Sequence, residues 1–120
     1  MEIAPDGSEV HPLTRTARCS SAQFVLRPGA VARAVHHRSV EEVWHVTQGT
    51  GELWLKEQGT ERIAALQPGV TIAIAQGVHF QFRADGDTPL CVFAVTSPPW
   101  PLEGPDEAII VEGPWVPNVR

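Results

Sequence analysis

Turn signals built from glycine and proline divide this chain into segments too short for long helices. Eleven prolines and ten glycines are spread over 120 residues. None of the segments between them shows a 3.6-residue apolar repeat over about ten residues. The segments instead alternate in polarity or are apolar and β-branched, which is typical of β-strands. Short strands spaced roughly 8 to 12 residues apart predict an all-β sandwich or barrel.

The turns also indicate how the chain is organised. We expect strands at residues 22–26, 31–37, 42–47, 52–56, 62–66, 70–75, 79–83 and 90–96. The sequence from Gln48 to Gly51 predicts a tight hairpin between two of them. A barrel is expected at residues 19–97, after a polar N-terminal arm at residues 1–18. Residues 98–120 are rich in proline and contain Trp100 and Trp115, which indicates an extended segment that packs on the barrel or on a partner subunit.

Charge, hydropathy and cysteine content exclude several classes of protein. The formal net charge of −5 and the single lysine, Lys56, argue against nucleic-acid binding. No apolar run approaches the roughly 20 residues of a membrane helix, and the N-terminus lacks the basic and apolar parts of a signal peptide. Cys19 and Cys91 do not form a CxxC pair. We therefore expect a cytoplasmic protein that binds neither nucleic acid nor membranes.

Residues capable of binding metals or transferring protons concentrate in two stretches, 28–54 and 66–83. In chain order they are His36, His37, Glu41, Glu42, His45 and His79. Because successive side chains of a strand point to opposite faces, adjacent members of this set separate. Glu42 shares a face with Trp44, whereas Glu41 and His45 point the other way.

The spacing of these residues resembles that of a known family. Glu42 is followed by six residues and then by Gly49, and further on Gly69 is followed by Gly77 and His79. This order resembles the two motifs of the cupins, G(X)5HXH(X)3–4E(X)6G and G(X)5PXG(X)2H(X)3N, over roughly residues 23–96. The resemblance implies a double-stranded β-helix, or jelly-roll barrel.

The second motif departs from the family pattern at three positions. Ala75 stands where a proline is usual, and His79 comes one residue early. Arg83, four residues after this histidine, takes the position of the asparagine.

The first motif allows two alignments, because its histidines are adjacent rather than separated by one residue. With a spacer of four residues before Glu42, His37 is the second histidine and Val35 replaces the first. With a spacer of three, His36 is the first histidine and Arg38 replaces the second. We prefer the first alignment, which keeps His36 as the alternative ligand.

The resemblance then implies a metal site made of His37, Glu42 and His79. Two imidazoles and one carboxylate with open positions suit Fe(II), Mn, Ni or Zn. The resemblance also implies that Glu42 is a catalytic group in proton transfer.

Five further residues form the expected substrate pocket, namely Arg33, Trp44, Trp54, Gln81 and Arg83. By strand alternation Arg33 shares a face with His37, and Gln81 and Arg83 share one with His79. A guanidinium group inside a barrel mouth needs an anionic partner. The two arginines therefore suggest a small ligand that carries a carboxylate, phosphate or enolate oxygen.

These features favour a metal-dependent enzyme of dioxygenase, isomerase or decarboxylase type that acts on a small molecule. The alternative is a non-catalytic binding or sensor protein without a metal, and a further alternative is a structural dimer with a vestigial pocket. We also expect a homodimer, because open strand edges and a tail with two tryptophans leave surface to be covered.

Overall fold

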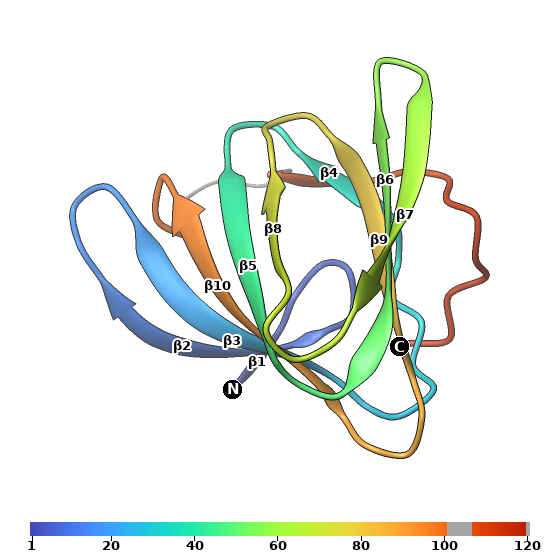
Figure 1. Cartoon of the computed structure of the whole chain (residues 1–120). Coiled ribbons are helices and arrows are strands. Elements are labelled where there is room, and N and C mark those ends of the chain that lie inside the picture. The colour runs from blue at the N-terminus through green and yellow to red at the C-terminus, as the bar shows by residue number, and fades with distance from the viewer. Residues whose placement is uncertain (101–106, 120) are drawn as a thin grey trace.

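The computed structural model describes residues 1–100 and 107–119, and it folds into two antiparallel sheets. The first sheet has the order β1 (Glu2–Ile3), β2 (Glu9–Arg15), β3 (Ser20–Leu26), β10 (Leu90–Ser97), β5 (Glu41–Gln48) and β8 (Thr71–Ile74). The second has the order β11 (Ala108–Ile110), β4 (Val35–His37), β9 (His79–Asp85), β6 (Thr50–Glu57) and β7 (Thr60–Leu66). Figure 1 shows the two sheets facing each other. Among the described residues there is no helix long and apolar enough to cross a membrane.

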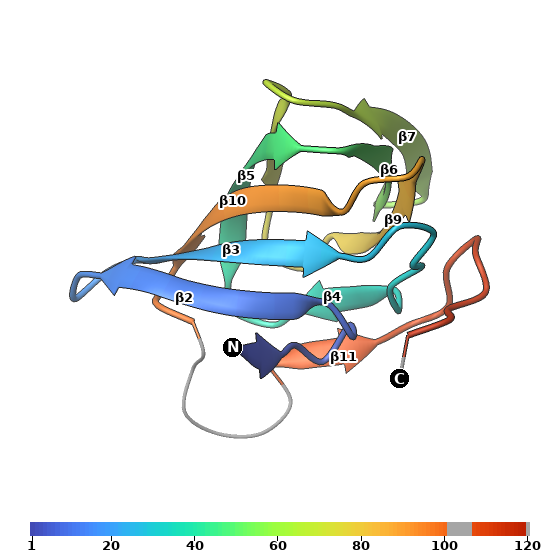
Figure 2. The ribbon, with the colours of Figure 1, turned by 90° about the horizontal axis from the view of Figure 1, so that it is seen from below.

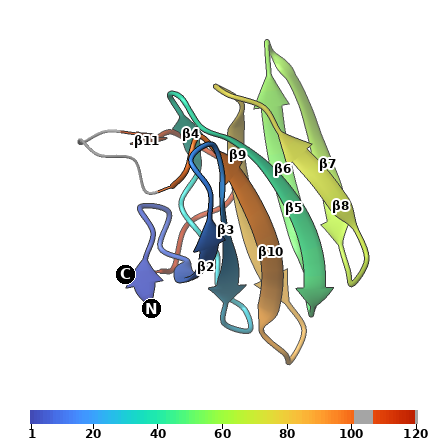
Figure 3. The same cartoon turned by 90° about the vertical axis from the view of Figure 1, so that its left-hand side faces the viewer.

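From β3 to β11 the chain passes back and forth between the two sheets, and only β6 and β7 follow each other within one sheet. This alternation is the topology of a double-stranded β-helix, so the predicted all-β jelly-roll fold is confirmed. Figure 3 looks onto the first sheet, where β10 lies between β3 and β5.

The core fills the space between the sheets with every second residue of the strands. Trp44 of β5 packs edge-on against Phe24, Phe80 and Phe82, with ring centroids 5.8, 5.8 and 4.8 Å away. Edge-to-face geometry is a favourable arrangement for aromatic rings. The aromatic cluster therefore joins β3, β5 and β9 across the barrel.

The predicted hairpin at residues 48–51 is wrong, because β5 and β6 belong to different sheets. Gly49 has a positive φ of 80°, and a Cβ there would lie 2.2 Å from the carbonyl oxygen of Pro89. Only glycine allows the chain to cross so close to another backbone segment. The hairpin of the second sheet lies instead between β6 and β7, where Gln58 and Gly59 both have positive φ.

Both terminal regions pack on the barrel. The segment expected to be a polar arm adds β1 and β2 to the first sheet and buries Val10 in the core. At the other end, β11 pairs with β4, and the chain beyond it runs along the outside of the second sheet. Figures 1 and 2 show this C-terminal segment beside β9, on the side away from β10. Residues 101–106 and 120 of the expected extended segment lie outside the described residues.

Candidate functional site

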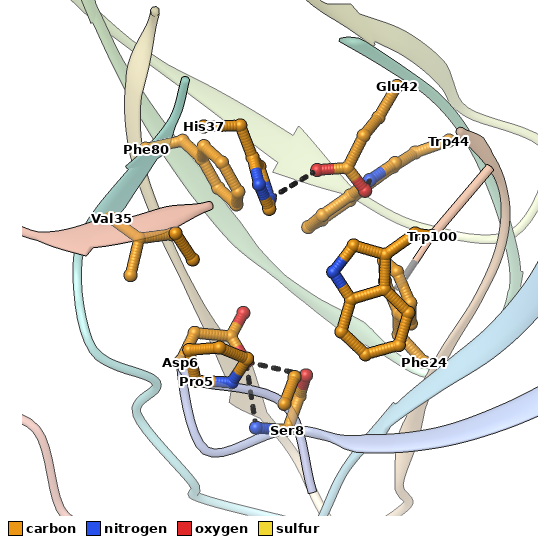
Figure 4. A pocket seen from close by; sticks show the side chains of 12 residues that line it. Pro5, Asp6, Ser8, Phe24, Val35, His37, Glu42, Trp44, Phe80 and Trp100 are labelled. Atoms are coloured by element: carbon orange, nitrogen blue, oxygen red, sulfur yellow. Dashed lines mark hydrogen bonds and ion pairs between the residues drawn. The ribbon is translucent and has the colours of Figure 1, made fainter. Parts of the chain in front are cut away.

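A cavity at one end of the barrel has polar side chains on two opposite walls. It is lined by Ala4, Pro5, Asp6, Ser8, Phe24, Val35, His37, Glu42, Trp44, Phe80, Trp100 and Ala108. Figure 4 shows Asp6 and Ser8 across the cavity from His37 and Glu42, with aromatic side chains between them. The volume open to the centre of a water molecule is only about 20 Å³. The cavity therefore has room for one water molecule or a group of similar size.

His37 and Glu42 form an ion pair on the first wall. Alternation turns Val35 and His37 of β4 and Glu42 and Trp44 of β5 into the barrel. The Nε2 atom of His37 lies 3.2 Å from Oε2 of Glu42. The indole Nε1 of Trp44 donates a hydrogen bond of 3.2 Å to the other oxygen, Oε1. Two donors on different strands thus hold the Glu42 carboxylate in place.

The second nitrogen of His37 faces another carboxylate. Its Nδ1 lies 3.7 Å from Oε1 of Glu107, which also accepts hydrogen bonds from the backbone amides of Ser39 and Val40, each at 2.8 Å. Burial alone would lower the pKa of His37. The hydrogen bond and charge of Glu42, followed by the charges of Glu107 and Asp6, outweigh burial and raise that pKa above 6.5. The imidazole consequently retains its proton to higher pH than an exposed histidine does.

Asp6 and Ser8 form the opposite wall. Oδ1 of Asp6 accepts hydrogen bonds from the backbone amide and the hydroxyl of Ser8, at 2.9 and 2.7 Å. Burial raises the pKa of Asp6, an effect that these hydrogen bonds oppose and the charge of Glu42 reinforces. This residue was not predicted from the sequence. An Asp followed two residues later by Ser is typical of an Asx turn, but nothing in that pattern indicates that the turn closes a barrel.

The structure does not bring His79 together with His37 and Glu42. His79 and His36 lie on the other face of their strands, where their rings stack at 5.0 Å between centroids. Phe80 takes the inward position and stacks on His37 at 5.9 Å. The reason is strand alternation, because a histidine that comes one residue early points away from the barrel. Burial, together with the nearby charges of His36 and Lys56, lowers the pKa of His79.

Four of the five predicted pocket residues do not line this cavity, and only Trp44 does. Arg83 pairs with Glu52 and lies 4.1 Å over the ring of Trp115. The side-chain amide of Gln81 bonds to the backbone of Ala32 and Trp115.

Arg33 and Trp54 also lie outside the cavity. Arg33 donates to the carbonyl oxygen of Val119 at 3.4 Å, and Nε1 of Trp54 donates to Glu61 at 2.8 Å. The expected face-sharing of Gln81 and Arg83 is present, but it is the outer face that the C-terminal segment covers. The arginines thus provide no anion-binding group inside the barrel.

The residues of the cavity do not fit the metal site that was expected from the sequence. Val35 and Phe80 occupy inward positions where the family motifs have histidines. Across residues 1–100 and 107–119 no group of three or more His, Cys, Asp or Glu side chains is arranged to hold a metal ion. His37 and Glu42 are instead paired with each other.

Comparisons with known proteins agree with this fold. A family model described as a cupin domain matches residues 22–96. No curated protein matches the chain in a sequence search.

Similar solved structures include a protein of Thermus thermophilus named TT1209, with 20% identity, a TM-score of 0.67 and coverage of 82% of this chain and 90% of that one. KdgF from a Halomonas species has 21% identity, a TM-score of 0.67 and coverage of 82% and 85%. An oxalate decarboxylase has 20% identity, a TM-score of 0.68 and coverage of 81% and 27%. At these identities the likeness concerns the fold. Because the family model spans more than half of the sequence, the chain belongs to the cupin family.

Proposed function

We propose that this cupin binds a small neutral carbonyl compound in the barrel and exchanges protons with it without a metal. The observation that carries the proposal is the pair of polar walls, Asp6 on one side of the cavity and the His37–Glu42 pair on the other. A base and an acid on opposite sides of a ligand are what proton abstraction next to a carbonyl group requires.

The proposed step is an enolisation. Glu42 removes a proton from the carbon next to the carbonyl group, and the electron pair of that C–H bond forms the C=C bond. The π electrons of the C=O bond move to the oxygen, which takes the proton of Asp6. The C–H bond of the ligand and the O–H bond of Asp6 break, the O–H bonds of Glu42 and of the enol form, and the reverse step returns both protons. His37 and Trp44 position Glu42 through their hydrogen bonds to its two oxygens. Enolisation begins isomerase reactions, one of the classes expected from the sequence.

Several features of the cavity support these roles. The raised pKa of Asp6 lets this group keep its proton to higher pH than an exposed aspartic acid does. Ser8 uses only Oδ1 of Asp6, which leaves the second oxygen available to a ligand. The carboxyl groups of Asp6, Glu42 and Glu107 around one imidazole disfavour an anion. A neutral ligand therefore suits the site better than the anionic one expected from the two arginines.

A non-catalytic binding protein is the second candidate, and the small size of the cavity favours it. A ligand of several heavy atoms fits only if the segment from Ala4 to Ser8 or Trp100 moves. Trp100 is tied to β3, because its backbone amide donates to Oγ of Ser20 at 2.8 Å. A ligand that only displaces the segment from Ala4 to Ser8 or Trp100, without reacting, would change the shape of the protein surface, as in a sensor protein.

Deuterium exchange separates these candidates without knowledge of the natural substrate. Small neutral ketones and hydroxyketones are incubated with the protein in D2O, and loss of their α-hydrogen signals is followed by proton NMR. Binding is followed in parallel by the fluorescence of Trp44 and Trp100, with Trp44→Phe and Trp100→Phe to assign the signal. We expect exchange that Glu42→Gln and Asp6→Asn slow by roughly 100-fold or more. His79→Ala, on the outer face, is the matched control and should leave the rate unchanged.

The outcomes are distinct. Fluorescence changes without exchange by any compound would replace catalysis with simple binding. Exchange that requires an added divalent metal and is lost with a chelator would restore the metal-dependent enzyme expected from the sequence. Neither binding nor exchange across the panel would refute the proposal.

A cytoplasmic location is part of the same proposal. Cys19 and Cys91 are both free, as expected for a protein kept in a reducing compartment.

A further inference from the structure

The C-terminal segment, residues 111–119, is held on the outer face of the second sheet by hydrogen bonds to its backbone. The amide of Val111 donates to the carbonyl oxygen of Ala34 at 2.9 Å. Further along, the side-chain amide of Gln81 donates to the carbonyl oxygen of Trp115 at 2.8 Å and accepts from the backbone amide of Trp115 at 3.2 Å. Gln81 is only 1% exposed, so water competes little for these two bonds.

Asn118 fixes the far end of this segment. Its backbone amide donates to the carbonyl oxygen of Val31 at 3.1 Å, and its side-chain oxygen accepts from the amide of Val31 at 2.7 Å. Its side-chain nitrogen donates to the carbonyl oxygen of Gly29 at 3.0 Å. These bonds set the place of the next residue, Val119, which is half-buried and packs against the core.

Val119 lies against the turn that carries Asp6. Gly7 of this turn has a φ of 93°, and a Cβ at this position would overlap the side chain of Val119. The absence of a side chain at Gly7 thus lets Val119 reach the turn. Arg33 joins the two segments, because its backbone amide donates to the carbonyl oxygen of Asp6 at 2.8 Å and its guanidinium group donates to that of Val119 at 3.4 Å. Figures 1 and 2 show the end of the C-terminal segment next to the turn between β1 and β2.

We propose that Val119 is a positioning residue, which holds the turn of residues 4–8 against the barrel and thereby fixes Asp6 on its wall of the cavity. Inside the turn, the amide of Ala4 donates to Ser8 and the amide of Gly7 donates to Ala4, at 2.9 and 2.8 Å. These two bonds shape the turn but do not attach it to the barrel, whereas the contact with Val119 does. The role of Asp6 rests on the proposed function, but the position of the turn is measured without any ligand.

Amide hydrogen exchange followed by NMR measures that position. In Val119→Ala, the amides of Gly7 and Ser8 should exchange at least about 10-fold faster than in the wild-type protein, because the turn opens more often. The amides of β9 and β10 should keep their rates. The matched control is Val116→Ala, the same substitution in the same segment at a side chain that is 87% exposed, and it should change none of these rates.

Asn118→Ala is a second variant that leaves Val119 in place. It removes the side-chain bonds to Gly29 and Val31 and should also speed exchange at Gly7, and it decides the matter if circular dichroism shows that Val119→Ala is unfolded. Unchanged exchange in the turn would overturn the proposal. Equal acceleration in Val116→Ala, or acceleration through all strands, would also overturn it, because the effect would then not come from the contact with the turn.

A double-mutant cycle tests the contact itself. Gly7→Ala should lower the Tm of the wild-type protein, since the new Cβ meets Val119. In Val119→Gly the same substitution should lower the Tm less, because the strain of the positive φ is common to both backgrounds and only the contact differs. Equal Tm losses in the two backgrounds would show that Val119 does not press on the turn.

The ketone assay then tests whether Val119 acts through Asp6. Val119→Ala should slow the exchange of α-hydrogens about 10-fold, and Asp6→Asn should slow it less in this background than in the wild-type protein. An equal effect of Asp6→Asn in both backgrounds would overturn the positioning role. If the wild-type protein exchanges no ketone, the proposed function fails, and the amide rates of the turn still decide whether Val119 holds it.

Discussion

Restoring the two absent histidines should create the metal site that this chain lacks. Val35 and Phe80 face each other across β4 and β9, and both line the cavity with His37 and Glu42. The double substitution Val35→His and Phe80→His would therefore surround one point with three imidazoles and a carboxylate, a set that suits Ni, Zn, Mn or Fe(II). Both positions already point into the cavity, so no backbone movement is needed.

The size of the effect follows from linkage. Without metal, loss of the packing of Phe80 against His37 and Trp44 should destabilise the double variant by about 2 kcal/mol. Metal at 100 times its dissociation constant stabilises a site by about 2.7 kcal/mol. For a domain of this size each kcal/mol shifts the Tm by roughly 4 °C. Adding Ni or Zn should therefore raise the Tm of the variant by about 10 °C.

Differential scanning fluorimetry with and without metal measures this shift. The wild-type protein should not respond, and adding His37→Ala to the double variant should abolish the response. No metal response from a folded double variant would show that positions 35 and 80 do not point at His37 and Glu42. An equal response from the wild-type protein would show that its site is already complete.

Two further predictions concern the cavity and the sheet crossing. The raised pKa values of His37 and Asp6 mean that each contributes stability that is fully present below its unfolded pKa and lost as pH rises through its folded pKa. The lowered pKa of His79 acts in the opposite direction, so the contribution of Asp6 is measured as a difference between two proteins. In thermal unfolding between pH 4 and 9, the stability of the wild-type protein relative to Asp6→Asn should fall with rising pH; the same pH profile in both proteins would contradict the assignment. Gly49→Ala should lower the free energy of unfolding by about 3 kcal/mol, because the new Cβ meets the backbone of Pro89. Gly59 also has a positive φ but open space around it, so Gly59→Ala should lower that free energy by only about 1 kcal/mol. Equal losses of unfolding free energy in the two variants, measured by urea unfolding, would show that the contact with Pro89 does not explain the effect at Gly49.

The sequence indicated the fold, and it turned His37, Glu42 and Trp44 to the same side, because both depend on local alternation. Gly49 lies seven residues after Glu42, and the spacer of four residues before that glutamate turns His37 toward it. The same rule, applied strictly to His79, would have turned Phe80 inward and the histidine outward. The family pattern led us to expect His79 inside the barrel. In the structure Phe80 points inward and His79 outward, as strand alternation requires.

Other features depend on contacts between distant segments, which alternation does not specify. The sequence placed Gln81 and Arg83 on one face but did not indicate that the C-terminal segment covers that face. Asp6 reaches the cavity because β1 and β2 extend the first sheet, a pairing that a polar N-terminal sequence does not reveal. The sequence indicated the turn at Gly49 but not that the chain crosses there from one sheet to the other. That crossing follows from the pairing of β5 with β10 and of β6 with β9, which lie far along the chain.

The metal content of the wild-type protein shows whether the barrel cavity works without a metal ion. Protein without a His-tag is purified in the absence of chelators and measured by inductively coupled plasma mass spectrometry, before and after incubation with Fe(II), Mn, Ni and Zn. His37 and Glu42 are already paired with each other, and in the part of the chain that the structure describes no group of three or more His, Cys, Asp or Glu side chains is arranged to hold a metal. We therefore expect far less than one metal ion per chain in both states. One equivalent of a metal, lost in Glu42→Gln but kept in His79→Ala, would show that the cavity is a metal site after all.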